Sequence, residues 1–322
     1  MPNLINRRLI VGGLSALGVT TAVPFAAAQD KSLSRIPVEG LITWSESVMV
    51  LCLDSEIRNG LSMRLSRYPD LGLTWLWIHV IRDGEVYAYT DQFLPSTGTH
   101  ITSEQMGAEY TVPGVKARMA RTGTAAGMQG MSFSADVLAH RGPDAINGPG
   151  TIPISLSGVF HPGALHKNAQ AGRFERSGHV EAVTEVAGRK LAISGVAKAH
   201  EQTQTNPRFG SSFTYAMLWS DKASLVGLLA RDARFGDFIS KGEDRPINQF
   251  YAEPWSPQRK FAAKFKDGTV LQGEAKTRVR FEVPVFNRVW HGQMVQASIG
   301  GERMVGMVND WKPEDQPYGL PQ

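Results

Sequence analysis

Short segments of alternating apolar and polar side chains, joined by tight turns, constrain the fold of this 322-residue chain most strongly. Leu61 to Tyr68 (LSMRLSRY) alternates with a period of two, which is typical of a strand with one buried face. The pairs Asp83-Gly84 and Asp267-Gly268 favour the tight turns of β-hairpins. Helical periodicity of useful length is hard to find, and Ser132 to His140 is the best rival for a helix. The chain is therefore predicted to be built from antiparallel strands.

Further strand candidates extend this pattern along the chain, at 44–53, 75–81, 86–93, 130–139, 152–160, 179–186, 190–197, 213–219, 225–230, 260–265, 270–284 and 293–308. We expect about sixteen to twenty short strands in two blocks, and one β unit of ~8–10 strands takes ~100–150 residues. This predicts an all-β protein of two antiparallel β-barrel halves, with an N-terminal domain at 29–165 and a C-terminal domain at 173–322. The segment His161 to Gly172 is interpreted as the crossover between them. One large β-sandwich with elaborated loops is the alternative.

The first residues indicate an export signal that is not part of the fold. Arg7 and Arg8 precede an apolar run from Leu9 to Ala28, and the run ends in the small residues Ala26-Ala27-Ala28. Paired arginines favour the twin-arginine route, with a Sec signal or an uncleaved anchor as the alternatives. No other apolar stretch is long enough to span a bilayer. Residues 1–28 are thus interpreted as a signal peptide, and the mature protein is expected in the periplasm or outside the cell.

Composition and motifs exclude several function classes. Loss of the two signal arginines lowers the formal net charge from +4 to +2, which is too balanced to indicate a nucleic-acid partner. The sequence contains no phosphate-binding loop, no G-x-G-x-x-G after a strand and no G-x-S-x-G elbow. His200-Glu201 begins like the zinc signature H-E-x-x-H, but Gln204 takes the place of the second histidine, so no metal site is predicted. The single cysteine, Cys52, lies in an apolar run and is interpreted as a small buried hydrophobe. Binding or cofactor-free acid–base chemistry remains.

A polar run between two apolar strands is the strongest candidate for a reactive site. His200, Glu201, Gln202 and Gln204 follow a glycine-led strand and precede the aromatic-rich segment Phe213 to Trp219. Acid–base groups concentrated in this way are what a proton-transfer site inside a β-barrel would contain. An ordinary polar loop is the alternative interpretation.

The segment Gly195 to Gln204 resembles a motif of a known family. In the AttH-like proteins related to carotenoid 1,2-hydratase, a glycine-led strand ends in a motif close to Tyr-His-Asp-His-Asn/Ser-Trp-Gly. Ala199-His200-Glu201-Gln202 stands in the place of Tyr-His-Asp-His, and the meander of Leu61 to Phe93 is similar to the aromatic-rich first half of that family. The tryptophan-glycine end of the motif is replaced by Gln204-Thr205. The resemblance implies two lipocalin-like barrels in tandem and a hydrophobic substrate, since the wider family includes hydratases and cyclases of isoprenoid-like or polyketide-like molecules.

Two pairs of residues are candidate catalytic groups. Glu201 is expected to be the proton donor, because burial raises the pKa of a carboxyl group and keeps it protonated. His200 would orient Glu201 or accept a proton; in the alternative, Glu201 pairs with Arg208 and both are loop residues. Asp54 and Glu56, two residues apart at the end of the first strand, are a second candidate pair, because neighbouring carboxylates can divide acid and base roles between them. A solvated strand end is the alternative there.

Five aromatic or histidine side chains are predicted to bind the substrate: Trp75, Trp77, His79, Tyr215 and Trp219. The first three share one face of a strand and could line a barrel cavity, where aromatic rings stack on a polyene and stabilise a cation. Asp91 on the neighbouring strand is a candidate catalytic partner for His79. A filled aromatic core is the alternative for Trp75, Trp77 and His79, and packing between the two barrels is the alternative for Tyr215 and Trp219.

These observations predict a cofactor-independent lyase or isomerase. Its reaction would be hydration or dehydration, a double-bond shift or a cyclisation of a hydrophobic, isoprenoid-like small molecule. A lipocalin-like carrier that binds an apolar molecule without chemistry is the alternative. A structural protein of the cell envelope is a third interpretation, and it predicts no cavity.

Overall fold

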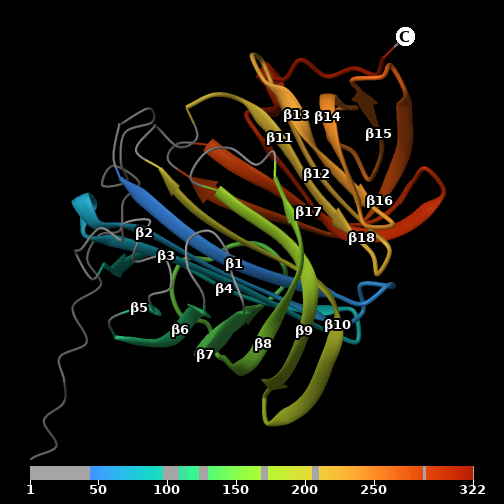
Figure 1. Ribbon diagram of the computed structural model, residues 1–322. Coiled ribbons are helices and arrows are strands. Elements are labelled where there is room, and N and C mark those ends of the chain that lie inside the picture. Colours follow the sequence, from blue (N-terminus) through green and yellow to red (C-terminus); the bar gives the residue numbers. More distant parts are fainter. Residues whose placement is uncertain are drawn as a thin grey trace, which may run out of the picture. The chain divides into compact units, whose positions relative to one another are not determined.

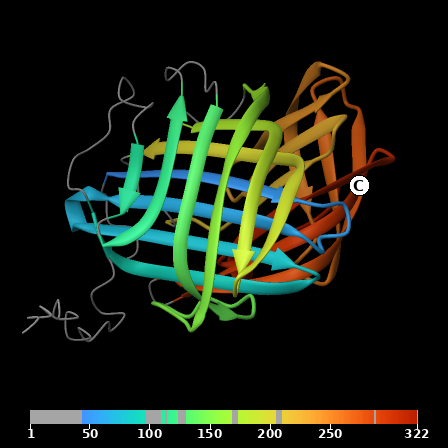
Figure 2. The ribbon, with the colours of Figure 1, turned by 90° about the horizontal axis from the view of Figure 1, so that it is seen from below.

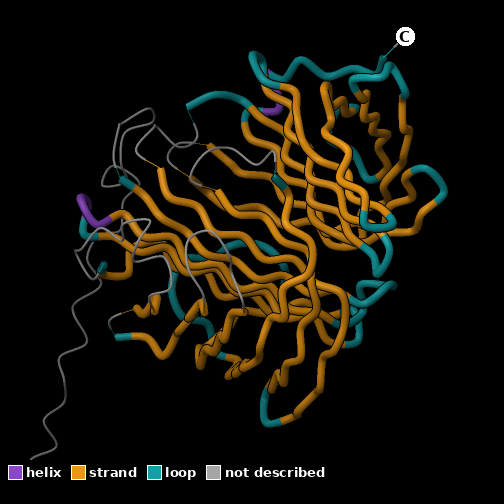
Figure 3. Tube along the Cα trace, in the orientation of Figure 1, coloured by secondary structure: helices purple, strands orange, loops and turns teal. Residues whose placement is uncertain are grey.

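The computed structural model describes residues 44–96, 109–112, 114–122, 130–167, 173–204, 210–285 and 288–321, and strands dominate this part of the chain (Figures 1 and 3). The expected signal peptide lies outside these residues. The strands are β1 (Ser45–Leu53), β2 (Gly60–Tyr68), β3 (Leu73–Arg82), β4 (Glu85–Pro95), β5 (Glu109–Val112), β6 (Val115–Thr122), β7 (Gly130–Arg141), β8 (Ile152–His166), β9 (Arg173–Val186), β10 (Arg189–Gln204), β11 (Phe213–Trp219), β12 (Ala223–Ala230), β13 (Arg234–Ser240), β14 (Glu243–Ala252), β15 (Gln258–Phe265), β16 (Val270–Val285), β17 (Arg288–Ile299) and β18 (Glu302–Trp311). The described helical elements are two short 3-10 turns, Pro69–Leu71 and Pro313–Asp315.

The first ten strands form one antiparallel sheet in the order β4-β3-β2-β1-β10-β9-β8-β7-β6-β5. The sheet curls back on itself, as Figure 2 shows for the blue and green strands, and β4 also pairs with β7. That pairing is limited to Tyr87 with Arg141 and Ala88 with His140. Nearer its start, from Gly130 to Asp136, β7 pairs with β6 instead. The first sheet is therefore a barrel-like unit whose seam is closed only at one end.

The remaining strands, β11 to β18, form a closed antiparallel barrel. Each strand pairs with the next along the chain, and β11 pairs with β18 to complete the ring. Asp-Gly turns join strands where the sequence predicted hairpins, and both Gly84 and Gly268 have the positive φ that such turns require. The all-β fold of two antiparallel units in tandem is confirmed.

Period-two alternation divides the apolar residues into three cores. In β1, Val48 and Val50 face the interior of the first sheet, whereas Met49 and Leu51 pack against the outer face of the barrel. A third core fills the barrel itself. Because the barrel covers the outer face of the first sheet, β2 is buried along its whole length, although its alternation predicted only one buried face. The polar side chains of that face are therefore held between the two sheets.

The change from one sheet to the other comes later in the chain than expected. The segment 161–172 was interpreted as a crossover, but β8 continues through His166, because a register shift between Pro162 and Leu165 absorbs the break. Strands β9 and β10 then pair within the first sheet, and the chain enters the barrel between Gln204 and Phe213. Hence the expected boundary between 165 and 173 does not coincide with the change of sheet. The helical alternative for 132–140 is wrong, since this segment lies within β7.

Within the described residues, we find no helix with the length and apolar character needed to cross a membrane.

Candidate functional site

His200 and Glu201 both lie in strand β10, and their side chains point to opposite faces of the first sheet. His200 pairs in register with Met49, which packs between the two sheets. Glu201 pairs with Val48, which belongs to the interior core of the first sheet. Side chains directly opposite one another across a ladder share a face, and successive residues alternate. The two groups therefore do not act on one substrate atom, and the alternative of a polar loop is wrong for both.

Glu201 is buried inside the first sheet beside a cation. Its Oε2 atom lies 2.7 Å from Nε of Arg121 in β6, and both side chains are fully buried. The Arg121 guanidinium also lies over the ring of Phe174, with its Cζ atom 5.8 Å from the ring centroid. An ion pair at this distance requires the ionised form of Glu201. The geometry therefore does not fit the expected role of Glu201 as a protonated donor. The alternative partner, Arg208, lies outside the described residues.

His200 belongs instead to a row of side chains that crosses the first sheet at right angles to its strands. Cross-strand pairing places one residue of each strand in this row, from β8 to β3: His166, Glu175, His200, Met49, Arg64 and Trp77. All six side chains lie between the sheet and the barrel or contact residues that do. We call these six residues the inter-sheet row. It brings two imidazoles, a carboxylate and a guanidinium together from strands that are far apart in sequence.

Glu175 is the most densely contacted member of the inter-sheet row. Its Oε1 atom accepts a hydrogen bond from the Tyr215 hydroxyl at 2.6 Å and lies 2.5 Å from Nε of Arg173. Its Oε2 atom lies 3.2 Å from Nζ of Lys198, and Nδ1 of His200 is 4.0 Å from Oε1. Glu175, Lys198 and His200 are almost completely buried. Cations from β9 and β10 and a hydroxyl from the barrel thus surround one carboxylate.

Burial and neighbouring charges set the protonation states of this cluster. Burial alone would raise the pKa of Glu175, but Lys198, Arg173 and His200, with the Tyr215 hydrogen bond, hold that pKa below its usual value. Burial lowers the pKa of Lys198, and the charge of Glu175 opposes this shift. Burial also raises the pKa of Tyr215 well above its usual value, so the phenol keeps its proton. The cluster therefore holds an ionised carboxylate and a phenol that donates to it.

The two histidines of the inter-sheet row are neutral. Burial lowers the pKa of His200 well below its ordinary value, and the charge of Glu175 opposes this only in part. Burial has the same effect on His166, and the charge of Lys198 adds to it. Nε2 of His166 lies 2.7 Å from the hydroxyl of Ser224 in β12, which joins the sheet to the barrel. A neutral imidazole can accept a proton, which is the first requirement for a general base.

Several buried polar atoms near His200 have no hydrogen-bond partner among the described residues. Both ring nitrogens of His200 are in this state, and so are the indole nitrogens of Trp77 and Trp290. The two indoles contact each other, with ring centroids 4.7 Å apart, and the Arg64 guanidinium lies against both, with its Cζ atom 5.1 Å from the ring centroid of Trp77 and 5.5 Å from that of Trp290. Buried polar groups are nearly always hydrogen-bonded, and leaving one unpaired costs about 1–3 kcal/mol. This part of the row is therefore suited to a ligand that supplies the missing partners.

The predicted substrate-binding residues all lie in the core between the two sheets. Trp75, Trp77, Tyr215 and Trp219 belong to this core, which is where the alternatives of a filled aromatic core for the first two and of packing between barrels for the last two would place them. Of the four, Trp77 contacts Arg64 and Tyr215 donates a hydrogen bond to Glu175. His79 packs on Phe281 with ring centroids 4.7 Å apart, and burial lowers the pKa of His79 to about 4.

The remaining candidate acids are placed apart from the inter-sheet row. Asp91 pairs in register with Leu76, which faces the interior of the first sheet, so Asp91 is not a partner of His79. Asp54 organises the turn after β1, because its carboxylate accepts backbone hydrogen bonds from Glu56 at 3.1 Å, Arg58 at 2.9 Å and Asn59 at 2.8 Å. These contacts give Asp54 a structural role as a turn cap.

Glu56 and Cys52 also lie outside the inter-sheet row. Glu56 is exposed and lies 3.7 Å from the guanidinium of Arg278, so it does not form a carboxylate pair with Asp54. Cys52 is buried, as predicted, and burial together with the charge of Asp54 raises the pKa of its thiol to about 12.

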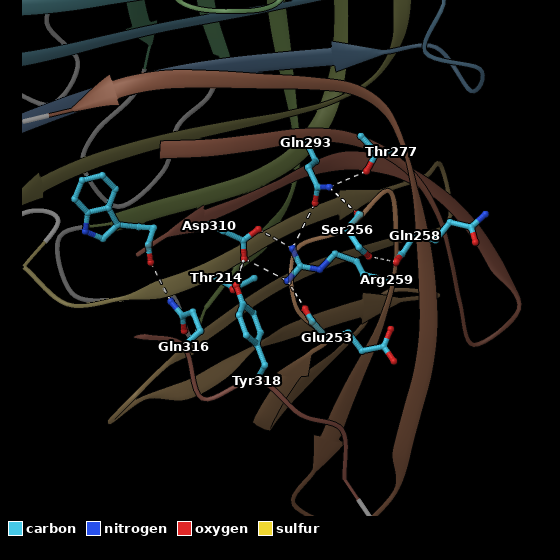
Figure 4. A network of polar contacts seen from close by, with 11 residues as sticks. Thr214, Glu253, Ser256, Gln258, Arg259, Thr277, Gln293, Asp310, Gln316 and Tyr318 are labelled. Carbon is cyan, nitrogen blue, oxygen red and sulfur yellow. Dashed lines mark hydrogen bonds and ion pairs between the residues drawn. The ribbon is translucent and has the colours of Figure 1, made fainter. Parts of the chain in front are cut away.

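A second buried polar network lies inside the barrel (Figure 4). Nη1 of Arg259 lies 2.6 Å from Oδ2 of Asp310, and Nη2 of Arg259 donates to the carbonyl oxygen of Glu253 at 2.7 Å. Asp310 also accepts hydrogen bonds from Thr214 at 2.6 Å and Tyr318 at 3.0 Å. Because its charges are paired and hydrogen-bonded, we interpret this network as a structural tie between strands β11, β15 and β18. Among the described residues, no group of three or more His, Cys, Asp or Glu side chains could hold a metal ion.

Sequence reasoning missed most of the polar cluster, namely His166, Arg173, Glu175, Lys198, Arg64, Ser224 and Trp290. His166 lies in the segment that was interpreted as the crossover, yet it is a buried residue of β8. The one available signal was the period-two spacing of Lys198 with His200, which puts both on the same face of a strand. The other members come together only through the register of the sheet.

The fold, two antiparallel β units in tandem, is similar to the folds of solved structures of an AttH-like protein and of CghA. No family profile and no curated protein sequence matches this chain. Among solved structures, an AttH-like protein from Nitrosomonas europaea is 10% identical, with a TM-score of 0.60 over 90% of this chain and 98% of the other. CghA crystallised with Sch210972 is 8% identical, with a TM-score of 0.54 over 84% of this chain and 88% of CghA. A second structure of CghA, at 9% identity, has a TM-score of 0.52 over 86% of this chain and 92% of CghA. The resemblance in fold that the sequence implied is confirmed.

Proposed function

We propose that this protein is a cofactor-independent enzyme, a lyase or isomerase that moves protons on an apolar small molecule. The observation that carries the proposal is His200, a buried neutral imidazole whose two ring nitrogens have no hydrogen-bond partner among the described residues, with Nδ1 4.0 Å from the ionised carboxylate of Glu175. The expected acid, Glu201, lies on the other face of the sheet. The proposed reaction therefore begins with proton removal by His200 and not with proton donation by Glu201.

In the proposed reaction, a ring nitrogen of His200 takes a proton from a carbon beside a carbonyl group. The C–H electron pair becomes a C=C bond, and the carbonyl oxygen becomes an oxyanion. Arg64 is close enough to His200 to affect its pKa and would stabilise that oxyanion. Glu175 would stabilise the imidazolium that forms, as a carboxylate does beside a catalytic histidine. In a β,γ-unsaturated carbonyl compound, returning the proton to the γ-carbon shifts the double bond into conjugation. In a β-hydroxy carbonyl compound, the oxyanion reforms the carbonyl group, the β C–O bond breaks, and the proton goes to the departing hydroxyl, which leaves as water.

The surroundings of the inter-sheet row favour an apolar, isoprenoid-like substrate. Trp75, Trp77, Met217 and Trp290 belong to the apolar core between the sheets. Rings of this kind pack on hydrocarbon chains and leave orientation to a few polar groups. The likeness to CghA crystallised with Sch210972 adds support, because a compound is bound in a protein of the same fold.

The test is conversion by purified protein of a panel of linear and oxygenated terpenes, some with a carbonyl group, without added cofactor. Wild type, His200→Gln, Glu201→Gln and His179→Gln would be compared by mass analysis of the products. His179 is the matched control, since it is a half-buried histidine outside the inter-sheet row, with Nε2 3.0 Å from the Ser194 hydroxyl. We expect His200→Gln to bind substrate and lose at least a hundredfold in conversion rate, in line with the ~10²–10⁴-fold effect of general acid–base catalysis. The control variant should keep wild-type activity.

Two results would contradict the proposal. Conversion that is retained in His200→Gln but lost in Glu201→Gln would show that Glu201, inside the first sheet, is the catalytic group. Binding without conversion by the wild type, across the panel, would make the protein a carrier.

We also propose that the protein is exported through its N-terminal segment. The support is the Arg7-Arg8 pair before an apolar run that ends in small residues. Changing both arginines to lysine should leave the precursor inside the cell if the twin-arginine route is used. Unchanged export of that variant would favour the Sec route.

A further inference from the structure

A pocket opens at the incompletely closed seam of the first sheet. Strand β4 pairs with β7 only at Tyr87 and Ala88, and β7 then pairs with β6 from Asp136 onwards. Beyond Ala88, β4 has no ladder with β6, and Thr90 forms an isolated bridge with Gly148 from the segment between β7 and β8. A cavity of about 780 Å³ lies here, lined by residues of β4, β6, β7, β8 and the end of β9. Pockets that bind small molecules typically measure ~300–1,000 Å³.

The floor of this seam pocket is apolar. Tyr89, Leu94 and Ile154 line it, and all three belong to the core of the first sheet. Val115 and Val137 form part of its walls and pack against the same core. A ligand that enters the seam pocket therefore contacts the apolar interior of the sheet. Each Å² of apolar surface removed from water contributes about 25 cal/mol, so a hydrocarbon body is favoured.

The charges of the seam pocket are mainly negative. Its ionisable side chains, other than tyrosine, are Asp91, Asp136, Glu185 and Lys116. Lys116 lies 3.8 Å from Asp136, and both side chains are exposed at the rim. Asp91 is different, because it is only 4% exposed and lies on the interior face, beside the apolar floor. Burial raises the pKa of Tyr89, and the negative charge of Asp91 raises it further, so the field of this carboxylate reaches the floor of the pocket.

We propose that the seam pocket binds an amphiphilic amine, a molecule with an apolar body and one positively charged head. The apolar body would lie on Tyr89, Leu94 and Ile154, and the ammonium group would lie beside Asp91. This site is separate from the inter-sheet row, because Asp91 faces the interior of the first sheet and His200 faces the barrel. The role of Asp91 is then to bind a cation, and not to assist His79.

The test compares octylammonium, octanol and octyl sulfate as probes of one chain length, with binding to the full-length protein followed by calorimetry. We expect octylammonium to bind at least tenfold more tightly than octanol, and octyl sulfate to bind most weakly. Asp91→Asn should remove the preference for the ammonium probe, while Val137→Trp should block all three probes by filling the pocket. Glu56→Gln, which changes an exposed carboxylate outside the pocket, should behave as wild type.

Further comparisons separate this site from the proposed active site. His200→Ala should leave binding of octylammonium unchanged, and loss of binding in that variant would overturn the assignment to the seam. Equal affinity of wild type and Asp91→Asn for octylammonium would also overturn it, as would no binding by the wild type at millimolar probe. Should Asp91→Asn fail to fold, as judged by circular dichroism, Val137→Trp decides the question, because unchanged binding in that variant contradicts the proposal.

Discussion

Replacing Lys198 by methionine tests whether the buried ion pair between Lys198 and Glu175 stabilises the fold. The Lys198 and Glu175 side chains are fully buried, and Nζ lies 3.2 Å from Oε2. Removing one partner of a buried ion pair leaves the other charge uncompensated, which costs about 3–5 kcal/mol. Arg173 and the Tyr215 hydroxyl still contact Glu175 in the variant. We therefore expect the lower end of that range, a loss of about 3 kcal/mol in the free energy of unfolding at neutral pH.

The loss should also depend on pH. In the wild type, the pKa of Glu175 is below its unfolded value, so its contribution to stability is present above about pH 4.5 and is lost as the pH falls through the folded value. Without Lys198, burial raises that pKa, and the stabilising contribution at neutral pH becomes smaller. The difference between wild type and Lys198→Met should therefore be largest near neutral pH and should shrink toward about pH 4.

Urea unfolding followed by tryptophan fluorescence, at several pH values, measures both effects. Lys190→Met is the matched control, because Lys190 is exposed, lies 3.9 Å from Glu185 and belongs to the same strand. Surface pairs of this kind contribute about 0–1 kcal/mol. A loss below about 1 kcal/mol for Lys198→Met, or a loss that does not change with pH, would refute the reasoning.

Three further predictions concern the cores. Asp310→Asn should lower the free energy of unfolding by about 3 kcal/mol, because it leaves the buried Arg259 guanidinium without its carboxylate; an unchanged urea midpoint would contradict this. Gly292→Ala should cost about 1–3 kcal/mol, because the added Cβ atom would meet the Phe281 ring, and the same urea titration measures the cost. Cys52 should react with a thiol reagent at about pH 8 only when the chain is unfolded, because burial raises the pKa of the thiol to about 12; rapid reaction of the native protein would show that it is accessible.

The strands were predictable from the sequence because their signals are local. Alternation within Leu61 to Tyr68 and the Asp-Gly turns need only neighbouring residues, and the structure has strands and hairpins there. Strands β13 and β14 were not predicted, since their sequences, RFGDFIS and EDRPINQFYA, mix glycine or proline with charged residues. A closed barrel accepts such strands because the register of their neighbours holds them in place.

The candidate site was less predictable because it depends on pairing between distant strands. The sequence indicated His200 as a candidate, but we predicted Glu201 as its partner because the two residues are adjacent in the chain. In a strand, adjacent side chains face opposite sides, so the neighbours of His200 are Glu175 and Met49. These pairings are set by the register of the whole sheet, and no local pattern in the sequence contains them.

The pairing of β1 with β10 has a consequence for how the protein folds. These strands join residues 45–52 to residues 197–204, and the inter-sheet row runs across this junction. Long-range pairings of this kind form late, because the entropy of closing a large loop must be overcome before the contacts form. During synthesis, the edge of β1 that pairs with β10 therefore stays unpaired until β10 has been synthesised. We expect a fragment that ends before β10 to aggregate through this edge, even though it contains nine of the ten strands of the first sheet.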